Sequence, residues 1–138
     1  MSNSNRATLA ITSSILMAQD ITNHLKINPS RSHEKGTPLN PKIPDKNIRD
    51  KSSWILQSKL NRESPIEDKI NELLDVIQTQ LDSFKQIETK INLEIYCSFF
   101  LKKESGTFSL PSTTLAKIGS IPINIIVAIY PYDYSGED

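Results

Sequence analysis

One cysteine, Cys97, and two histidines, His24 and His33, are the side chains of this sequence best suited to nucleophilic chemistry. A cysteine reacts as its thiolate, so Cys97 would need an imidazole or another base nearby. Cys97 instead alternates with Ile95 and Phe99 on the apolar face of a predicted strand. A cysteine in that setting typically packs as a small hydrophobic residue with a protonated thiol. We therefore predict no catalytic residue.

Metal and cofactor motifs are absent from the sequence. It contains no C-x-x-C, H-x-x-x-H or H-E-x-x-H spacing, and the neighbouring pair His33 and Glu34 supplies too few ligands. No G-x-G-x-x-G or G-x-x-x-x-G-K-[ST] motif is present, and four glycines leave little material for a phosphate-binding loop. We predict no metal site and no cofactor.

Carboxylate pairs could support acid–base chemistry, and two kinds of pair occur here. Asp68, Glu72 and Asp75 follow helical spacing, but they lie on the polar side of a predicted helix, where solvation is the ordinary interpretation. Glu94 shares a strand face with Tyr96. Cross-strand pairing of Glu94 with a lysine is a more common arrangement than general-acid chemistry.

Basic side chains are the main candidates for ligand binding. The segment from Arg31 to Lys51 carries more Lys and Arg than Asp and Glu, but no aromatic residue that could stack on a base. A solvated loop is the favoured interpretation. The alternative is an anionic-ligand site, and its charge donors would be Arg6, Arg31, Lys35 and Arg49.

Aromatic residues supply a second set of candidate contacts. Trp54 could anchor a partner, although a tryptophan on a strand usually belongs to the core. Tyr130, Tyr132 and Asp133 belong to an aromatic and acidic C-terminal cluster. Tyrosine is enriched in protein interfaces, so this cluster is a candidate contact patch, with an edge or frayed terminal strand as the alternative.

Length and composition are those of an ordinary globular domain. The chain has 138 residues, of which 37% are hydrophobic and 23% charged, and its formal net charge is zero. That charge argues against a nucleic-acid partner, and no apolar run reaches the length of a membrane span. The N-terminus lacks a signal-peptide pattern, and a single cysteine excludes an intrachain disulfide, which fits the cytoplasm. We predict one domain over residues 1–138, with its core at about 6–130.

Hydrophobic periodicity predicts the elements that position these residues. Period-two alternation predicts strands at 6–12, 53–60 and 91–101, with shorter strands near 31–35 and 107–110. Residues 123–130 are apolar almost throughout, which predicts a strand covered on both faces or central in the sheet. Residues 36–51 are predicted to form a long Pro- and Lys-rich loop, and residues 131–138 a mobile acidic tail.

Three helices complete the predicted fold. A long helix starts with Ser64 as its N-cap, Glu67 as the second half of a capping box, and an apolar stripe that continues to Phe84. Short helices are predicted at 18–25 and 112–118, the latter with Leu115 facing inward and Gly119 as its left-handed end. The order predicts an α+β fold: a mixed, mainly antiparallel sheet with one long and two short helices packed on it.

The order of several short motifs resembles the small bacterial family called domain of unknown function 4279. The motifs are Arg6-Ala-Thr-Leu-Ala-Ile11, Asp20-Ile-Thr22, Asn28-Pro-Ser30, Lys35-Gly36, Trp54-x-x-x-Ser58, Tyr96-Cys97, Phe108-Ser-Leu110 and Ile118-Gly119. The resemblance implies a compact α+β domain and brings no established catalytic residues. The sequence departs from the family pattern in its long insert before Trp54 and in the single glycine of the turn at Gly106.

Two functional hypotheses follow from these observations. The favoured one is a non-enzymatic binding protein with a protein partner, of the immunity or antitoxin type found in bacterial competition or defence loci. Its basis is a small chain with no catalytic set, a basic loop and an acidic tail. The alternative is a domain that binds or senses a small anionic ligand such as a nucleotide.

Overall fold

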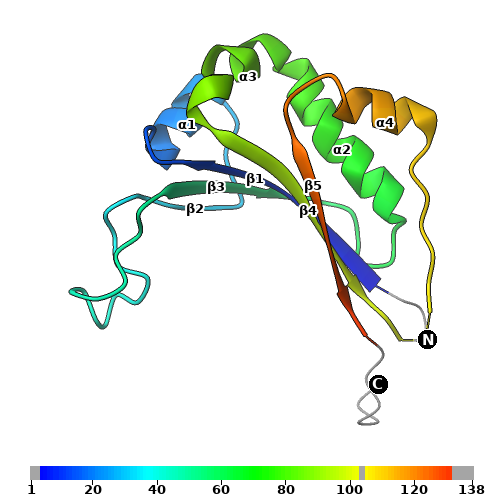
Figure 1. Ribbon diagram of the computed structural model, residues 1–138, viewed down its shortest axis with the longest axis horizontal. Helices are drawn as coiled ribbons and strands as arrows, with labels where there is room; N and C mark the ends of the chain where they lie inside the picture. Colours follow the sequence, from blue (N-terminus) through cyan, green and yellow to red (C-terminus); the bar gives the residue numbers. More distant parts are fainter. Residues whose placement is uncertain (1–3, 103–104, 132–138) are drawn as a thin grey trace.

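A five-stranded mixed sheet forms the centre of the computed structural model, which describes residues 4–102 and 105–131 (Figure 1). The strand order is β2-β3-β1-β4-β5, and the strands are β1 (Ser4–Ser13), β2 (Arg31–His33), β3 (Ser52–Gln57), β4 (Asn92–Phe100) and β5 (Asn124–Tyr130). The pairs β2–β3, β3–β1 and β1–β4 are antiparallel, whereas β4–β5 is parallel. The predicted mixed, mainly antiparallel α+β fold is confirmed.

The helices all lie on one face of the sheet (Figure 1). Within the described residues they are α1 (Ala18–Leu25), α2 (Ile66–Thr79), α3 (Leu81–Ile87), the 3-10 turn η1 (Glu88–Lys90) and α4 (Ser112–Ile118). None of the helices in the described ranges lies on the other face of the sheet, which is concave (Figure 1). No helix in the described ranges has both the length and the apolar character needed to cross a bilayer.

The core lies between the sheet and the helices, as the alternation in β1 dictates. Ala7, Leu9 and Ile11 point toward the helices and are buried, which confirms the predicted face of this strand. They meet a cluster of buried side chains from both layers: Ile21, Leu25, Trp54, Ile70, Leu73, Leu74, Ile77, Phe84, Leu93, Ile95 and Cys97. The period-two and period-3.6 patterns therefore bury one common set of apolar side chains.

The predicted long helix is in fact two helices, α2 and α3. The α-helical conformation is lost at Gln80 (φ −121°, ψ 31°), where the Thr79 hydroxyl donates to the carbonyl oxygen of Val76 at 2.9 Å. This change of direction lets Phe84 reach the core, where it is fully buried. The predicted capping box is also wrong: Pro65 is the N-cap, and the Ser64 hydroxyl donates to Asn61 Oδ1 instead.

The C-terminal part differs most from the sequence-based prediction. Residues 107–110 do not form a strand, and β5 is an edge strand rather than a central one. The reason is the connection through α4, which returns β5 parallel to β4 and outside it. Within α4, Leu115 is exposed rather than inward-facing, and Gly119 is right-handed (φ −73°) rather than left-handed.

Residues 36–51 form a hairpin-like excursion that extends away from the helices (Figure 1). A β-bridge joins Pro38 to Ile48, and the Leu39 N–H donates to the Asn47 carbonyl at 2.9 Å. Gly36 has φ +88°, a left-handed backbone conformation in which a residue with a side chain would be strained. The predicted loop is therefore a paired excursion at one end of the uncovered sheet face.

Candidate functional site

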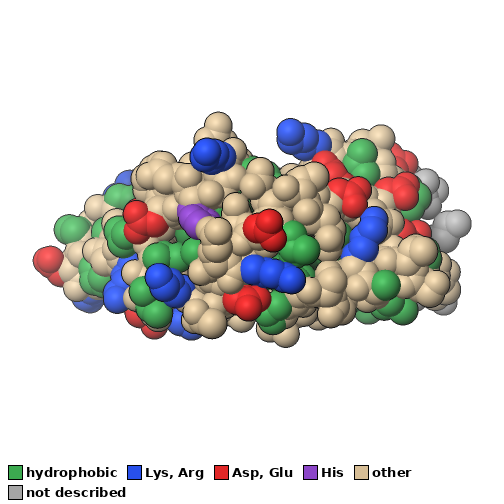
Figure 2. All heavy atoms as spheres, turned by 90° about the horizontal axis from the view of Figure 1, so that it is seen from above, with side chains coloured by type: hydrophobic (Ala, Val, Ile, Leu, Met, Phe, Trp, Pro, Cys, Tyr) green, Lys and Arg blue, Asp and Glu red, His purple; other side chains and the backbone are tan. Residues whose placement is uncertain are grey.

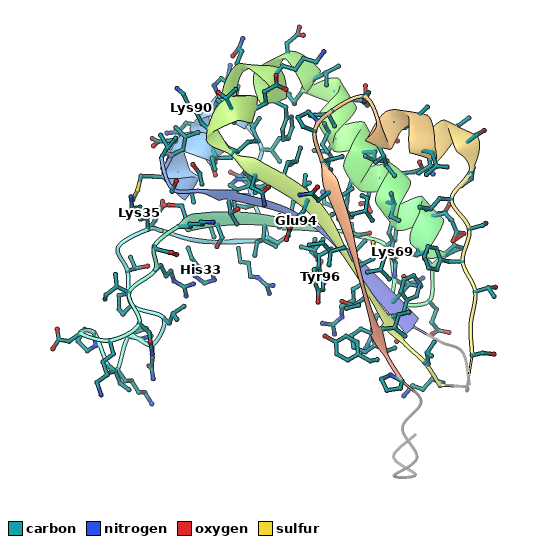
Figure 3. The ribbon with its side chains drawn as sticks, in the orientation of Figure 1. His33, Lys35, Lys69, Lys90, Glu94 and Tyr96 are labelled. Atoms are coloured by element: carbon teal, nitrogen blue, oxygen red, sulfur yellow. The ribbon has the colours of Figure 1, made fainter. Side chains whose placement is uncertain are left out.

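The uncovered face of the sheet brings together polar side chains from four strands. In the register, Thr8 of β1 lies opposite Gln57 on one side and Tyr96 on the other, and Arg6 lies opposite Ser98. Arg31 of β2 lies opposite Ile55. The labelled side chains of Tyr96 and His33 project from the sheet on the side away from the helices (Figure 3).

Two adjoining hollows open on this face and at the adjacent end of β1. The first, of about 260 Å³, is lined by Arg6, Thr8, Ser30, Arg31, Ile55, Gln57, Tyr96 and Ser98. The second, of about 220 Å³, is lined by Asn5, Arg6, Ala7, Gln57, Ser58, Leu60, Arg62 and Lys69. Arg6 and Gln57 line both hollows, which we together call the basic cleft.

The basic cleft is lined by positive charge, and the nearest carboxylate on record, that of Glu72, lies behind Ser58, whose hydroxyl donates to Glu72 Oε1. Its cations are Arg6, Arg31, Arg62 and Lys69, and no aspartate or glutamate lines either hollow in the described parts of the chain. None of the four forms an ion pair there, since the ion pair recorded among the described residues joins Lys117 to Asp75 on the helical layer. On that layer acidic and basic side chains are interspersed (Figure 2). An excess of positive charge in the lining of a concave site favours an anion.

Lys69 is the most unusual of these cations because it is 1% exposed. Its ammonium donates to Asn5 Oδ1 at 2.5 Å, to the Asn5 carbonyl at 2.7 Å and to the Arg62 carbonyl at 3.3 Å. Burial lowers the pKa of Lys69, as does the nearby Arg62 guanidinium, while Glu72 acts in the opposite direction. All three acceptors are neutral, so the ammonium is solvated by neutral groups, and the Glu72 carboxylate acts on it without a direct contact.

Aromatic rings hold the guanidinium groups of the cleft in place. The Arg6 and Arg62 guanidinium carbons lie 5.5 and 5.8 Å from the centre of the Phe100 ring, within cation–π range. Phe100 in turn stacks on Tyr130 at 4.9 Å with the rings almost parallel. An arginine stacked in this way keeps its N–H groups available for a planar anion.

Tyr96 lines the hollow on the open face of the sheet, beside Arg6. The Tyr130 hydroxyl, above all, raises the pKa of Tyr96, and lost hydration, a side-chain hydrogen bond to Tyr130 and the Glu94 carboxylate act in the same direction. Tyr96 therefore stays protonated at neutral pH, as a neutral hydrogen-bonding group beside the cations.

Residues 3–132 match the protein family described as Domain of unknown function (DUF4279). The chain belongs to this family. A search of the curated proteins and a search of the solved structures each found no match.

The DUF4279 domain assembles only part of the predicted cation set. Arg6 and Arg31 both line the basic cleft. Lys35 lies apart from it, because its ammonium donates to the Ser14 carbonyl at 3.0 Å, and Arg49 belongs to the excursion. The predicted anionic-ligand site is therefore reduced to two of its four residues.

The predicted aromatic contacts do not lie together either. Trp54 is 0% exposed, with Nε1 donating to Thr22 Oγ1 at 3.0 Å, so it is a core residue and no surface contact. Tyr130 is exposed and stacks on Phe100, the ring that contacts the Arg6 and Arg62 guanidinium groups, but it lines neither hollow. Tyr132 and Asp133 lie outside the described residues.

Sequence reasoning missed Arg62, Lys69 and Phe100. Lys69 did have a signal, because it lies three residues after Ile66 and four before Leu73 on the apolar stripe of α2. A lysine at such a position must be buried or bend away from the core. Arg62 and Phe100 carried no signal, because their approach depends on how the 58–65 segment returns past the end of β1.

The single thiol of the DUF4279 domain is not a nucleophile on this geometry. Cys97 is buried, and burial raises its pKa to about 11. The His24 ring is occupied elsewhere, with Nε2 2.9 Å from the Ser83 carbonyl oxygen. In the described ranges, no three His, Cys, Asp or Glu side chains converge on a possible metal position.

We expect the native protein to resist thiol labelling at pH 7.5 and to label fully in denaturant, because both burial and the raised pKa suppress the thiolate. The measurement is the time course of reaction with a chromogenic disulfide reagent. A Leu115→Cys variant, with its thiol on the exposed face of α4, is the positive control. Fast labelling of the native wild-type chain would contradict the assignment of Cys97 to the core.

Proposed function

We propose that this chain is a non-enzymatic binding protein whose basic cleft holds a small phosphate- or carboxylate-bearing ligand. The observation that carries the proposal is the convergence of Arg6, Arg31, Arg62 and Lys69 on one concave surface without a lining carboxylate among the described residues. The lining side chains include hydrogen-bond donors but no described His, Asp or Glu that could act as a general base. That composition fits binding of an anion better than its chemical conversion.

The geometry supports a small ligand in particular. Each hollow alone is smaller than the roughly 300–1,000 Å³ of typical small-molecule sites, and the two together fall in the lower part of that range. Arg6 stands between them and is held against Phe100, so its guanidinium is placed before the ligand arrives. A preorganised fork of this kind suits the two oxygens of a phosphate or carboxylate.

Phosphate-bearing compounds are expected to stabilise the protein against heat. At 100 times its dissociation constant, a ligand should add about 2.7 kcal/mol to the free energy of unfolding. The measurement is a thermal-shift screen with inorganic phosphate, pyrophosphate, ATP and citrate, followed by calorimetry of any hit. Arg6→Gln should weaken a hit about 10–100-fold, because it removes charge-assisted hydrogen bonds from both hollows.

Arg49→Gln is the matched control, because it makes the same change of charge on the excursion, outside the cleft. It should leave the affinity within about twofold of the wild-type value, since exposed charges at a distance are screened. The absence of a thermal shift with all four probes would contradict the proposal. An equal loss of affinity in Arg6→Gln and Arg49→Gln would contradict it as well.

A protein partner of the immunity or antitoxin type, the hypothesis favoured from the sequence, is our second proposal, and one observation supports it. The excursion presents three exposed apolar side chains, Leu39, Ile43 and Ile48, at the projecting end of the molecule. Apolar side chains on a projecting segment fit the contact surface of a protein. Co-purification at native expression level from the source organism tests this hypothesis, with Ile43→Asp as the variant that should lose the partner. Recovery of the chain without any second protein counts against it.

A further inference from the structure

The two edges of the sheet differ sharply in how they are protected. β2 is three residues long and follows Pro29, and it carries Arg31 and His33, features that discourage strand addition. β5 is seven residues long, carries no charged residue and pairs with β4 on one side only. Among the described residues nothing pairs with its other side. An edge of that length and composition is a template for a further strand.

The side chains of β5 are also unusually exposed for their type. Ile129 is 62% exposed and Val127 42%, although both lie on the helical side of the sheet, and Ile126 is 38% exposed on the open side. The helical layer therefore stops short of this edge. Apolar side chains that are exposed on both faces of an edge strand would be buried by a neighbouring strand that extends the sheet together with its helical layer.

A second copy of β5 fits this edge because the strand is self-complementary. An antiparallel pairing about a two-fold axis at Val127 sets Ile125 opposite Ile129 and bulky Ile126 opposite small Ala128. It also sets Asn124 opposite Tyr130, so polar groups meet at the two ends of the strand. No charge is buried in this register, because none is present in β5.

We propose that the chain forms a two-fold dimer in which the two β5 strands pair antiparallel about Val127 and join the sheets into one of ten strands. The axis of such a pairing runs perpendicular to the sheet, so both helical layers lie on the same side and continue one another. Val127 is then covered by Val127 of the second copy, and Ile129 by Ile125 of the second copy. The two basic clefts face the same direction, so the dimer presents two equivalent anion sites.

Analytical ultracentrifugation of the wild-type chain over a wide concentration range is the first test, and a reversible dimer is the expected result. Val127→Lys should raise the dimer dissociation constant at least about tenfold, because two ammonium groups would face each other at the axis. Ala116→Lys adds the same charge on the exposed surface of α4 and should leave the dimer unchanged. Val127 is already partly exposed, so circular dichroism should show both variants folded.

The register has its own test. A Val127→Cys variant in a Cys97→Ala background places two thiols opposite each other at the axis, and mild oxidation should give a covalent dimer on non-reducing gels. Cys97 is removed because it lies beside Val127 in the register of β4 and β5. The Cys97→Ala chain with Val127 unchanged is the matched control. If Val127→Lys fails to fold, Ile126→Lys repeats the test from the open face. A monomer at all concentrations, or a dimer that survives Val127→Lys and does not cross-link through Cys at position 127, overturns the proposal.

Discussion

Replacing Trp54 with alanine is expected to lower the free energy of unfolding by about 3–5 kcal/mol, the largest loss for a single substitution in this chain. Trp54 is 0% exposed and joins β3 to the core cluster, so its removal leaves a large cavity. The indole also donates to Thr22 Oγ1 at 3.0 Å, which ties β3 to α1. Urea denaturation followed by circular dichroism measures the change.

Two further variants separate the effect of the cavity on stability from the effect of the lost hydrogen bond. Trp54→Phe fills most of the volume but loses the donor, and Thr22→Val removes the acceptor with little change of shape. The second should cost about 1 kcal/mol, the usual net worth of one buried hydrogen bond. A loss below about 1 kcal/mol for Trp54→Ala would contradict the burial of this residue and return it to the candidate surface contacts.

Replacing Lys69 with methionine is expected to destabilise the protein by about 1–3 kcal/mol at neutral pH, the usual cost of leaving a buried polar group unsatisfied. The Asn5 and Arg62 carbonyls would lose their common donor. Part of this cost is offset, because methionine needs no desolvation of a charge. Denaturant unfolding of the variant and the wild type, each at several pH values, measures the difference.

The pH dependence follows from the lowered pKa of Lys69. The folded protein releases this proton at a lower pH than the unfolded chain, whose lysine keeps the ordinary value of 10.5. Between the two pKa values the unfolded chain binds more protons, so the contribution of Lys69 to wild-type stability rises with pH. The Lys69→Met variant lacks that rise. The stability difference should therefore widen as the pH approaches 10.5.

Lys85→Met on the exposed face of α3 is the matched control, and its effect on stability should stay within about 0.5 kcal/mol. A difference between wild type and Lys69→Met that shrinks as the pH rises would contradict the assigned direction of the pKa shift. It would then point to a group other than the Lys69 ammonium.

Local chemistry predicted well where one element interacts mainly with its own residues. The alternation of Ala7, Leu9 and Ile11 predicted β1 and its buried face, because a strand with one dry side needs period two. The short helix at 18–25 has the predicted bounds. Its N-terminus, however, is completed by Glu34, whose carboxylate accepts from the Ala18 and Gln19 N–H groups at 2.5 and 3.0 Å. No local pattern reveals a cap that arrives from sixteen residues away.

The C-terminal strand shows the opposite case. The apolar run at 123–130 predicted a covered strand, and its composition does suit burial. Its place at the sheet edge depends on α4, which carries the chain past β4 before it returns. The composition of a strand indicates how strongly its side chains favour burial, but it does not indicate which strand pairs with it. In this chain that mismatch is what motivates the proposed dimer.

The sequence by itself determined the α+β class, the faces of its main strands and helices and the burial of Cys97, because each depends on periodicity that neighbouring residues share. Only the tertiary structure decided which cations meet. Arg6 lies in β1, Arg31 in β2, Arg62 in the turn before α2 and Lys69 in α2. They come together because β3 pairs with both β1 and β2, and because the 58–65 segment returns past the end of β1. Proximity across strands is a property of pairing, which one-dimensional spacing does not encode.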